Sequence, residues 1–209
     1  MIASIAAIVD NDERMLAAFV EAENQLLART GLRLDPEWRA IRATLEERIL
    51  RADAAIFFGG SPTKLLAAFC FFELGPSVLE TLRRGGTFVA LSAGALVLCE
   101  RMIVYDAHAS DPMKRDFQLL DRGLGLVGGF QILAHCVDCI QTEDADNLAH
   151  LARRFSRRTC AGLNQESYLL VKIACPTPTS IGLYDGVYVF GPDGVKTRFD
   201  RGERIPWGA

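Results

Sequence analysis

The chain has 209 residues, of which half are apolar and 23% are charged, and its formal net charge is −3. This composition is typical of a globular protein and excludes an intrinsically disordered one. Lys and Arg are scattered rather than clustered, which argues against a nucleic-acid-binding protein. The length suits a single domain spanning residues 1–209.

The first segment, residues 2–9, is continuously apolar. No positively charged stretch precedes it and the acidic residues 10–13 follow, so the pattern predicts a buried strand rather than an export signal. No apolar run reaches the ~20 residues that a membrane-spanning helix needs. The sequence therefore predicts a cytoplasmic protein that does not enter a membrane.

Patterns typical of helices and strands alternate along the rest of the chain. We expect helices over residues 12–28, 36–50, from 62 onward, 76–84 and 144–157. We expect strands over residues 54–58, 87–91 and 130–133, and a short extended piece at 103–105. Because residues 54–58 are apolar without interruption, they predict a central strand buried on both faces.

The segment at 106–116 is polar and without periodicity, which indicates a loop. Near the C-terminus, residues 168–173, 181–183 and 187–190 predict strands joined as β hairpins. The whole pattern predicts an α/β fold of three layers, α/β/α, with a mainly parallel sheet and C-terminal hairpins.

The strongest chemical signal is Ser92, which follows an apolar strand directly and precedes Ala93 and Gly94. A nucleophile elbow needs this arrangement, because its serine lies in a strained turn where large neighbours would clash. The helix that follows would direct its positive dipole end at a developing oxyanion. The alternative is an ordinary serine that caps the helix.

A nucleophilic serine needs a general base, and the chain has three histidines. His150 lies on the polar side of its predicted helix, and His108 lies in the polar loop. His135 follows a buried strand, where α/β folds collect functional groups. His135 is therefore the preferred base.

The third member of such a triad is a carboxylate that orients the imidazole. Asp106 and Asp111 both lie in the loop between the serine and the histidine, and Glu100 lies on the helix after the elbow, where we expect it to face away. For each of them the alternative is a solvated surface charge.

The six cysteines include a Cys-x-x-Cys pair, Cys136 and Cys139, directly after His135. A zinc site would need further ligands, and the sequence offers no second pair. We therefore expect neither a metal nor another cofactor, and we expect most of the cysteines to be small core residues.

The stretch 52–171 resembles the serine peptidases of the peptidase E (aspartyl dipeptidase) and cyanophycinase family. The matching pieces occur in the family's order: residues 52–60 with Leu65 and Leu66, Ser92-Ala-Gly-Ala95, Met102-Ile-Val104, Gly123-Leu-Gly-Leu126, His135 and residues 162–171.

The resemblance implies a fold similar to the class I glutamine amidotransferases, with serine in place of the cysteine nucleophile. It implies Ser92 as nucleophile, His135 as base, and Asp111 as the acid, with Asp106 in reserve. The N–H groups of Gly60 and Ala93 would form the oxyanion hole.

The function that the resemblance implies is hydrolysis of a peptide or isopeptide bond in a small, acidic, Asp-containing peptide through an acyl-enzyme. The expected partner is this peptide substrate, without nucleic acid or membrane, and a homodimer stays open. The alternative is a catalytically inactive relative that binds a small ligand at the same place. Ser61 and Ala134 favour this alternative, because the family usually carries a polar residue such as Asn at the first position and cyanophycinase carries a polar residue at the second.

Overall fold

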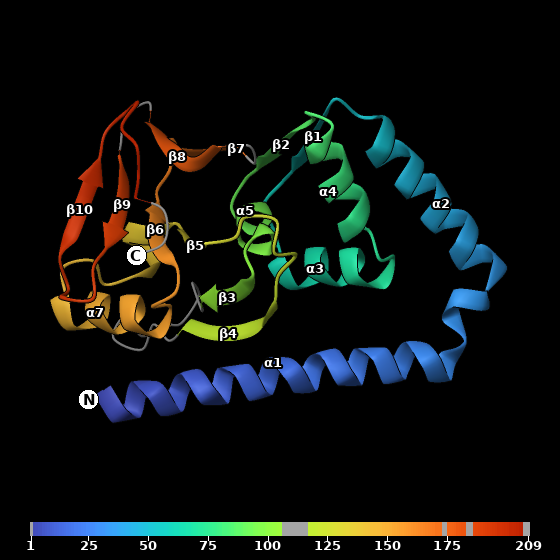
Figure 1. Ribbon diagram of the computed structural model, residues 1–209, viewed down its shortest axis with the longest axis horizontal. Helices are drawn as coiled ribbons and strands as arrows, with labels where there is room; N and C mark the ends of the chain where they lie inside the picture. Colours follow the sequence, from blue (N-terminus) through green and yellow to red (C-terminus); the bar gives the residue numbers. More distant parts are fainter. Residues whose placement is uncertain (1, 106–116, 173–174, 183–185, 207–209) are drawn as a thin grey trace. The chain divides into compact units, whose positions relative to one another are not determined.

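The computed structural model describes residues 2–105, 117–172, 175–182 and 186–206 (Figure 1). The chain forms two compact units, Asp10–Gly94 and Met1–Val9 with Ala95–Ala209. Parallel strand pairs and helices occur in both units, and antiparallel strands follow toward the C-terminus. The α/β class and the C-terminal hairpins are therefore confirmed, whereas the single domain over residues 1–209 stays a prediction.

The predicted strand over residues 2–9 is wrong, because these residues begin the helix α1 (Ile2–Thr30). The segment is rich in alanine, the best helix former, and no glycine or proline occurs before Gly31. The helix ends just before Gly31, whose φ of +61° lies in the left-handed region that ends helices.

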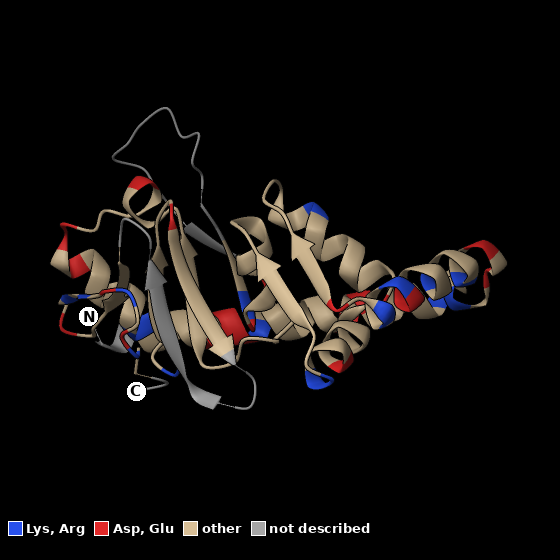
Figure 2. Ribbon diagram, turned by 90° about the horizontal axis from the view of Figure 1, so that it is seen from above, with Lys and Arg blue, Asp and Glu red and all other residues tan. Residues whose placement is uncertain are grey.

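In the unit Asp10–Gly94, local capping signals place the helices as the sequence predicts. Asp35 caps α2 (Pro36–Arg51) by accepting a hydrogen bond of 2.8 Å from the Trp38 N–H, and Ser61 caps α3 (Pro62–Phe71). A 3-10 turn, η1 (Leu32–Leu34), precedes α2, and α4 (Gly75–Arg83) follows α3. The charges along α2 alternate in sign at helical spacing, and Figure 2 shows both signs interleaved over the helices rather than gathered in one region.

The sheet of this unit consists of β1 (Ala54–Phe57) and β2 (Thr87–Ala90), which are parallel. On one face Phe57 packs against Phe69 of α3, with ring centroids 4.9 Å apart. The other face is not buried, because Ile56 is 53% and Val89 is 42% exposed. The expectation of a strand buried on both faces is therefore wrong for residues 54–58.

In the second unit, a four-stranded sheet has the order β10-β9-β6-β5. The pair β5 (Phe130–Ala134) and β6 (Thr159–Leu163) is parallel, whereas β9 (Val187–Phe190) is antiparallel to both β6 and β10 (Lys196–Phe199). The helix α7 (Ala145–Arg154) contacts β6 and β9 and buries Leu148 and Leu151. The short helices α5 (Ala93–Leu98) and α6 (Cys136–Cys139) begin just after β2 and β5.

Two antiparallel pairs complete the described strands: β3 (Arg101–Tyr105) with β4 (Phe117–Arg122), and β7 (Ser167–Lys172) with β8 (Cys175–Gly182). The predicted loop at 106–116 lies outside the described residues. Within the described chain, no single helix has the length and apolar character to cross a membrane, although α3 and α4, bent by 89°, pass that test as a pair.

Four of the cysteines, Cys99, Cys136, Cys139 and Cys160, are buried core residues, as the sequence predicts. Burial raises the pKa of the Cys99 thiol to about 12, and it does the same for Cys160. A thiolate is the reactive form of cysteine, so these two side chains are chemically inert near neutral pH.

Candidate active site

Ser92 lies in a sharp turn between β2 and α5, and its backbone is left-handed, with a φ of +51°. This conformation is uncommon for a residue with a side chain, because the Cβ atom approaches the backbone. The Gly94 N–H donates to the Leu91 carbonyl over 2.9 Å, which closes the turn around the serine. The side chain is half-buried at the end of the strand. This is the backbone geometry of a nucleophile elbow.

Two glycines, Gly94 shortly after Ser92 and Gly59 shortly after β1, allow the elbow to pack closely against the end of β1. A Cβ atom on Gly94 would lie 2.4 Å from the Phe57 carbonyl oxygen, closer than real Cβ atoms come to a neighbour. A Cβ atom on Gly59 would lie 3.2 Å from the Cβ atom of Ser92. Gly60, the predicted oxyanion donor, follows with a φ of +118°, whereas Ala93, the other predicted donor, is buried.

His135 occupies the same kind of position in the second unit. It follows β5, whose five residues are all buried, and its own side chain is exposed. Its φ of +52° and ψ of +44° are left-handed. The His135 carbonyl accepts hydrogen bonds from the N–H groups of Asp138 (3.1 Å) and Cys139 (2.9 Å), which start α6. An exposed imidazole therefore stands at the end of a rigid strand.

The other two histidines are placed differently. His108 lies outside the described residues. His150 is half-buried on α7, and its pKa lies below the usual range, first because burial disfavours the charged form and second because of Arg154. Nothing in its surroundings resembles the strand-end position of His135.

The predicted acids, Asp111 and Asp106, lie outside the described residues, so their assignment stays a prediction. Glu100 is engaged elsewhere in its unit. Its carboxylate accepts hydrogen bonds from the Arg158 guanidinium, one of them 2.8 Å long, and the arginine side chain is only 14% exposed. The Glu100 carboxylate therefore forms a structural ion pair with Arg158.

Glu166 is a candidate acid that the sequence reasoning missed. It lies in the turn between β6 and β7, is exposed, and has a left-handed φ of +66°. Because β5 and β6 are parallel, with Ala134 opposite Leu163, the residues after these strands emerge at the same sheet edge. The signal was present in residues 162–171, one of the pieces that carry the family resemblance.

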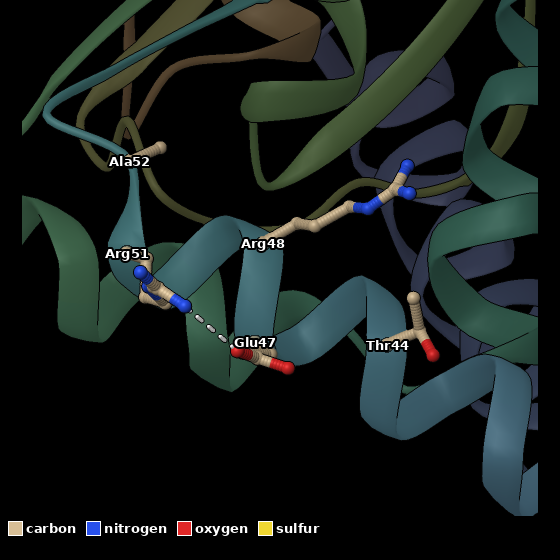
Figure 3. Close-up of a pocket in the computed structure, with 5 residues that line it drawn as sticks. All are labelled: Thr44, Glu47, Arg48, Arg51 and Ala52. Carbon is tan, nitrogen blue, oxygen red and sulfur yellow. Dashed lines mark hydrogen bonds and ion pairs between the residues drawn. The ribbon is translucent and has the colours of Figure 1, made fainter.

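A hollow in the unit Asp10–Gly94 has a different character. Figure 3 shows it on the last turns of α2, lined by Thr44, Glu47, Arg48, Arg51 and Ala52. Its one ion pair, between Arg51 and Glu47 over 3.0 Å, joins side chains that are 79% and 64% exposed. Arginines near the carboxyl end of a helix complement its dipole, which accounts for this cluster.

Among the described residues, no group of three or more His, Cys, Asp or Glu side chains is arranged to hold a metal ion. The Cys-x-x-Cys pair after His135 is buried within α6 and its flanks. The expectation of a protein without metal stays a prediction.

Comparison with solved structures finds a peptidase from an acI-B1 Actinobacterium, with a TM-score of 0.56 at 18% identity; the alignment covers 83% of this chain and 64% of that one. A protein assigned to peptidase E from Listeria monocytogenes EGD-e aligns with a TM-score of 0.42 at 15% identity, over 75% of this chain and 65% of that one. The chain thus spans less than two thirds of the length of either structure.

The first of these likenesses supports the α/β fold, and no curated protein matches the chain. The sequence model of Peptidase family S51 matches residues 6–173, well over half of the chain. This stretch includes Ser92, His135 and Glu166, the residues with left-handed backbones at strand ends. The chain therefore belongs to peptidase family S51.

Proposed function

We propose that the protein is a serine peptidase that uses Ser92 as its nucleophile and His135 as its general base. The observation that carries the proposal is the strained, left-handed turn at Ser92, just after β2, where Gly94 and Gly59 permit close packing. Strain of this kind persists at sites where the chemistry requires it. Membership of the family supports the same activity.

In the proposed reaction, the Ser92 hydroxyl oxygen attacks the carbonyl carbon of the scissile peptide bond. His135 accepts the hydroxyl proton, and the N–H groups of Gly60 and Ala93 stabilise the tetrahedral oxyanion. When the C–N bond breaks, the leaving amine receives the proton from His135 and an acyl-enzyme remains. Water then attacks the ester with His135 as base, and this releases the carboxylic acid and restores Ser92. None of these steps uses a metal or an organic cofactor.

The test of the nucleophile is labelling with a fluorophosphonate probe, which forms a covalent bond with an activated serine. The protein should become labelled at Ser92, and Ser92→Ala should abolish both labelling and hydrolysis while the fold remains intact. Loss of the nucleophile in a serine triad costs about 10⁶-fold in turnover. Substantial hydrolysis by folded Ser92→Ala would refute the assignment. Absence of labelling in the unaltered protein would favour the inactive, ligand-binding alternative.

For the acid, the resemblance favours Asp111, with Asp106 in reserve, and the topology adds Glu166. The acid should hold the imidazole in the correct tautomer, so its amide variant should lower activity by about 10⁴-fold, as in other serine triads. Comparison of Asp111→Asn, Asp106→Asn and Glu166→Gln in one hydrolysis assay therefore distinguishes them. The parallel pairing of β5 and β6 is the argument for Glu166. Its assignment fails if Glu166→Gln keeps full activity.

The substrate class in this proposal is a small acidic peptide, such as a dipeptide that begins with Asp, and it rests on the resemblance. Incubation of purified protein with a dipeptide library, with Ser92→Ala as the blank, would test it. Cleavage of apolar dipeptides in preference to acidic ones would contradict the substrate class but leave the peptidase chemistry standing.

A further inference from the structure

The turn that carries His135 is fixed from a neighbouring strand by Asn164. The Val137 N–H, two residues after His135, donates a hydrogen bond of 2.9 Å to Oδ1 of Asn164. Asn164 directly follows β6, the parallel partner of β5. The contact therefore ties the segment after β5 to the end of the neighbouring strand.

This hydrogen bond replaces a cap that α6 lacks. The first N–H groups of a helix have no partner within the helix, and a side chain at the N-cap commonly accepts from one of them. Here the N-cap residue is His135, whose side chain forms no capping hydrogen bond. Asn164 supplies the acceptor instead, from the end of the neighbouring strand.

A second contact holds the same turn against β6. The Cys136 side chain is fully buried and lies over Gly162, where a Cβ atom would come within 2.5 Å of the Cys136 sulfur. Gly162 therefore allows α6 to approach the strand closely, and the Asn164 hydrogen bond fixes the turn at that distance. Gly162 of β6 and Asn164 just after this strand thus restrain the residues on the C-terminal side of His135.

Such restraint matters because His135 has a strained backbone. A left-handed residue other than glycine persists only when its surroundings over-determine the conformation. If the turn relaxed, the imidazole would be displaced, and a displacement of about 1 Å in a catalytic group can cost about 100-fold in rate.

We propose that Asn164 is a positioning residue for His135, acting through its hydrogen bond to the Val137 backbone. The proposal rests on the proposed function, because it takes His135 as the general base. Asn164 itself need not contact the substrate.

The experiment compares Asn164→Ala with Asn164→Asp. Asn164→Ala should slow fluorophosphonate labelling and kcat by about 10- to 100-fold with little change in KM, and should speed amide hydrogen exchange at Val137 by about tenfold. Asn164→Asp keeps an acceptor oxygen, so it should restore the rate to within about threefold.

Asn147→Ala is the matched control, because Asn147 is a half-buried asparagine of the same unit whose side chain donates to the Gln141 carbonyl. It should leave labelling and the Val137 exchange rate unchanged. Wild-type labelling by Asn164→Ala, or an equal loss in Asn147→Ala, would overturn the proposal. If Asn164→Ala does not fold, Asn164→Ser takes its place with the same expectations, because the serine side chain is too short for its oxygen to reach the Val137 N–H.

The failure of the proposed function would look different. In that case the unaltered protein would not be labelled at all, and amide exchange at Val137 would alone decide the role of Asn164. Unchanged exchange in Asn164→Ala would then overturn the positioning role, and faster exchange would support it.

Discussion

Replacing Ser92 by glycine and by alanine separates backbone strain from chemistry. Both variants remove the hydroxyl group, so neither should hydrolyse peptides or react with a fluorophosphonate. Only Ser92→Gly removes the Cβ atom that makes the left-handed φ of +51° costly. The two variants should therefore differ in stability although they are equally inactive.

The size of the difference follows from two opposing effects. Relief of the left-handed conformation is worth about 1–2 kcal/mol. Glycine loses more chain entropy on folding, which offsets about 0.5–1 kcal/mol of that gain. The middle values of these two ranges leave the free energy of unfolding about 0.75 kcal/mol higher for Ser92→Gly than for Ser92→Ala. For a chain of this size the difference corresponds to a Tm higher by about 1–4 °C.

Ser77 provides the matched control in the same unit. It is buried in the helix α4, where its hydroxyl donates to Glu46, and both replacements lose that bond. Because glycine is the poorer helix former by about 1 kcal/mol, Ser77→Gly should be less stable than Ser77→Ala. Urea unfolding of the four variants measures both orders. If Ser92→Ala proves as stable as Ser92→Gly or more so, the turn is not strained and the reasoning is refuted.

Three further predictions concern the surroundings of the site. The pKa values of Cys99 and Cys160 are raised from 9.0 to about 12, so burial of the neutral thiols should stabilise the fold below pH 9, and this stabilisation should be lost as the pH rises toward 12. A pH series of urea unfolding checks this, and a free energy of unfolding that does not fall between pH 9 and 12 would contradict it. Glu100→Gln should lower the free energy of unfolding by about 1 kcal/mol or less and leave labelling of Ser92 unchanged, because the Glu100 side chain is 41% exposed and glutamine keeps an acceptor oxygen for Arg158. Gly94→Ala should lower the free energy of unfolding by about 1–3 kcal/mol, because its methyl group would lie 2.4 Å from the Phe57 carbonyl oxygen. A Tm equal to that of the unaltered protein would show that the elbow does not pack as closely as this distance indicates.

The elements that the sequence predicts correctly carry local signals that do not depend on the rest of the fold. Asp35 before a proline and Ser61 before another cap their helices through their own side chains. Residues 2–9 lack such a signal. They are apolar without interruption, so neither the period of a strand nor that of a helix stands out, and the alanine content and the absence of a breaker before Gly31 decide for the helix.

The residues of the candidate site likewise include some that the sequence predicts and one that it does not. The strand-end positions of Ser92 and His135 were predictable because each residue directly follows an apolar run in the sequence. Glu166 was not, because its interest arises from the pairing of β5 with β6, a contact between segments that the sequence does not place side by side. The exposed face of β1 was missed for a related reason: a continuous apolar run does not show whether a second layer covers it.

The residues with left-handed backbones distinguish structural strain from strain with a candidate function. Among the described residues other than glycine, φ is positive at Glu73, Ser92, His135 and Glu166. Glu73 has a structural explanation, because it ends α3 in a Schellman motif: its N–H donates to the Cys70 carbonyl and the next N–H, of Leu74, donates to that of Phe69.

The remaining three, Ser92, His135 and Glu166, follow the strands β2, β5 and β6, and no helix ends at any of them. Their side chains are a hydroxyl, an imidazole and a carboxylate, the three groups that a serine triad combines. An isolated strained residue would be weak evidence, because turns carry strain for many reasons. Strain at three strand ends, on residues whose side chains are of the types that acyl transfer uses, is the pattern that the proposed serine peptidase leads one to expect.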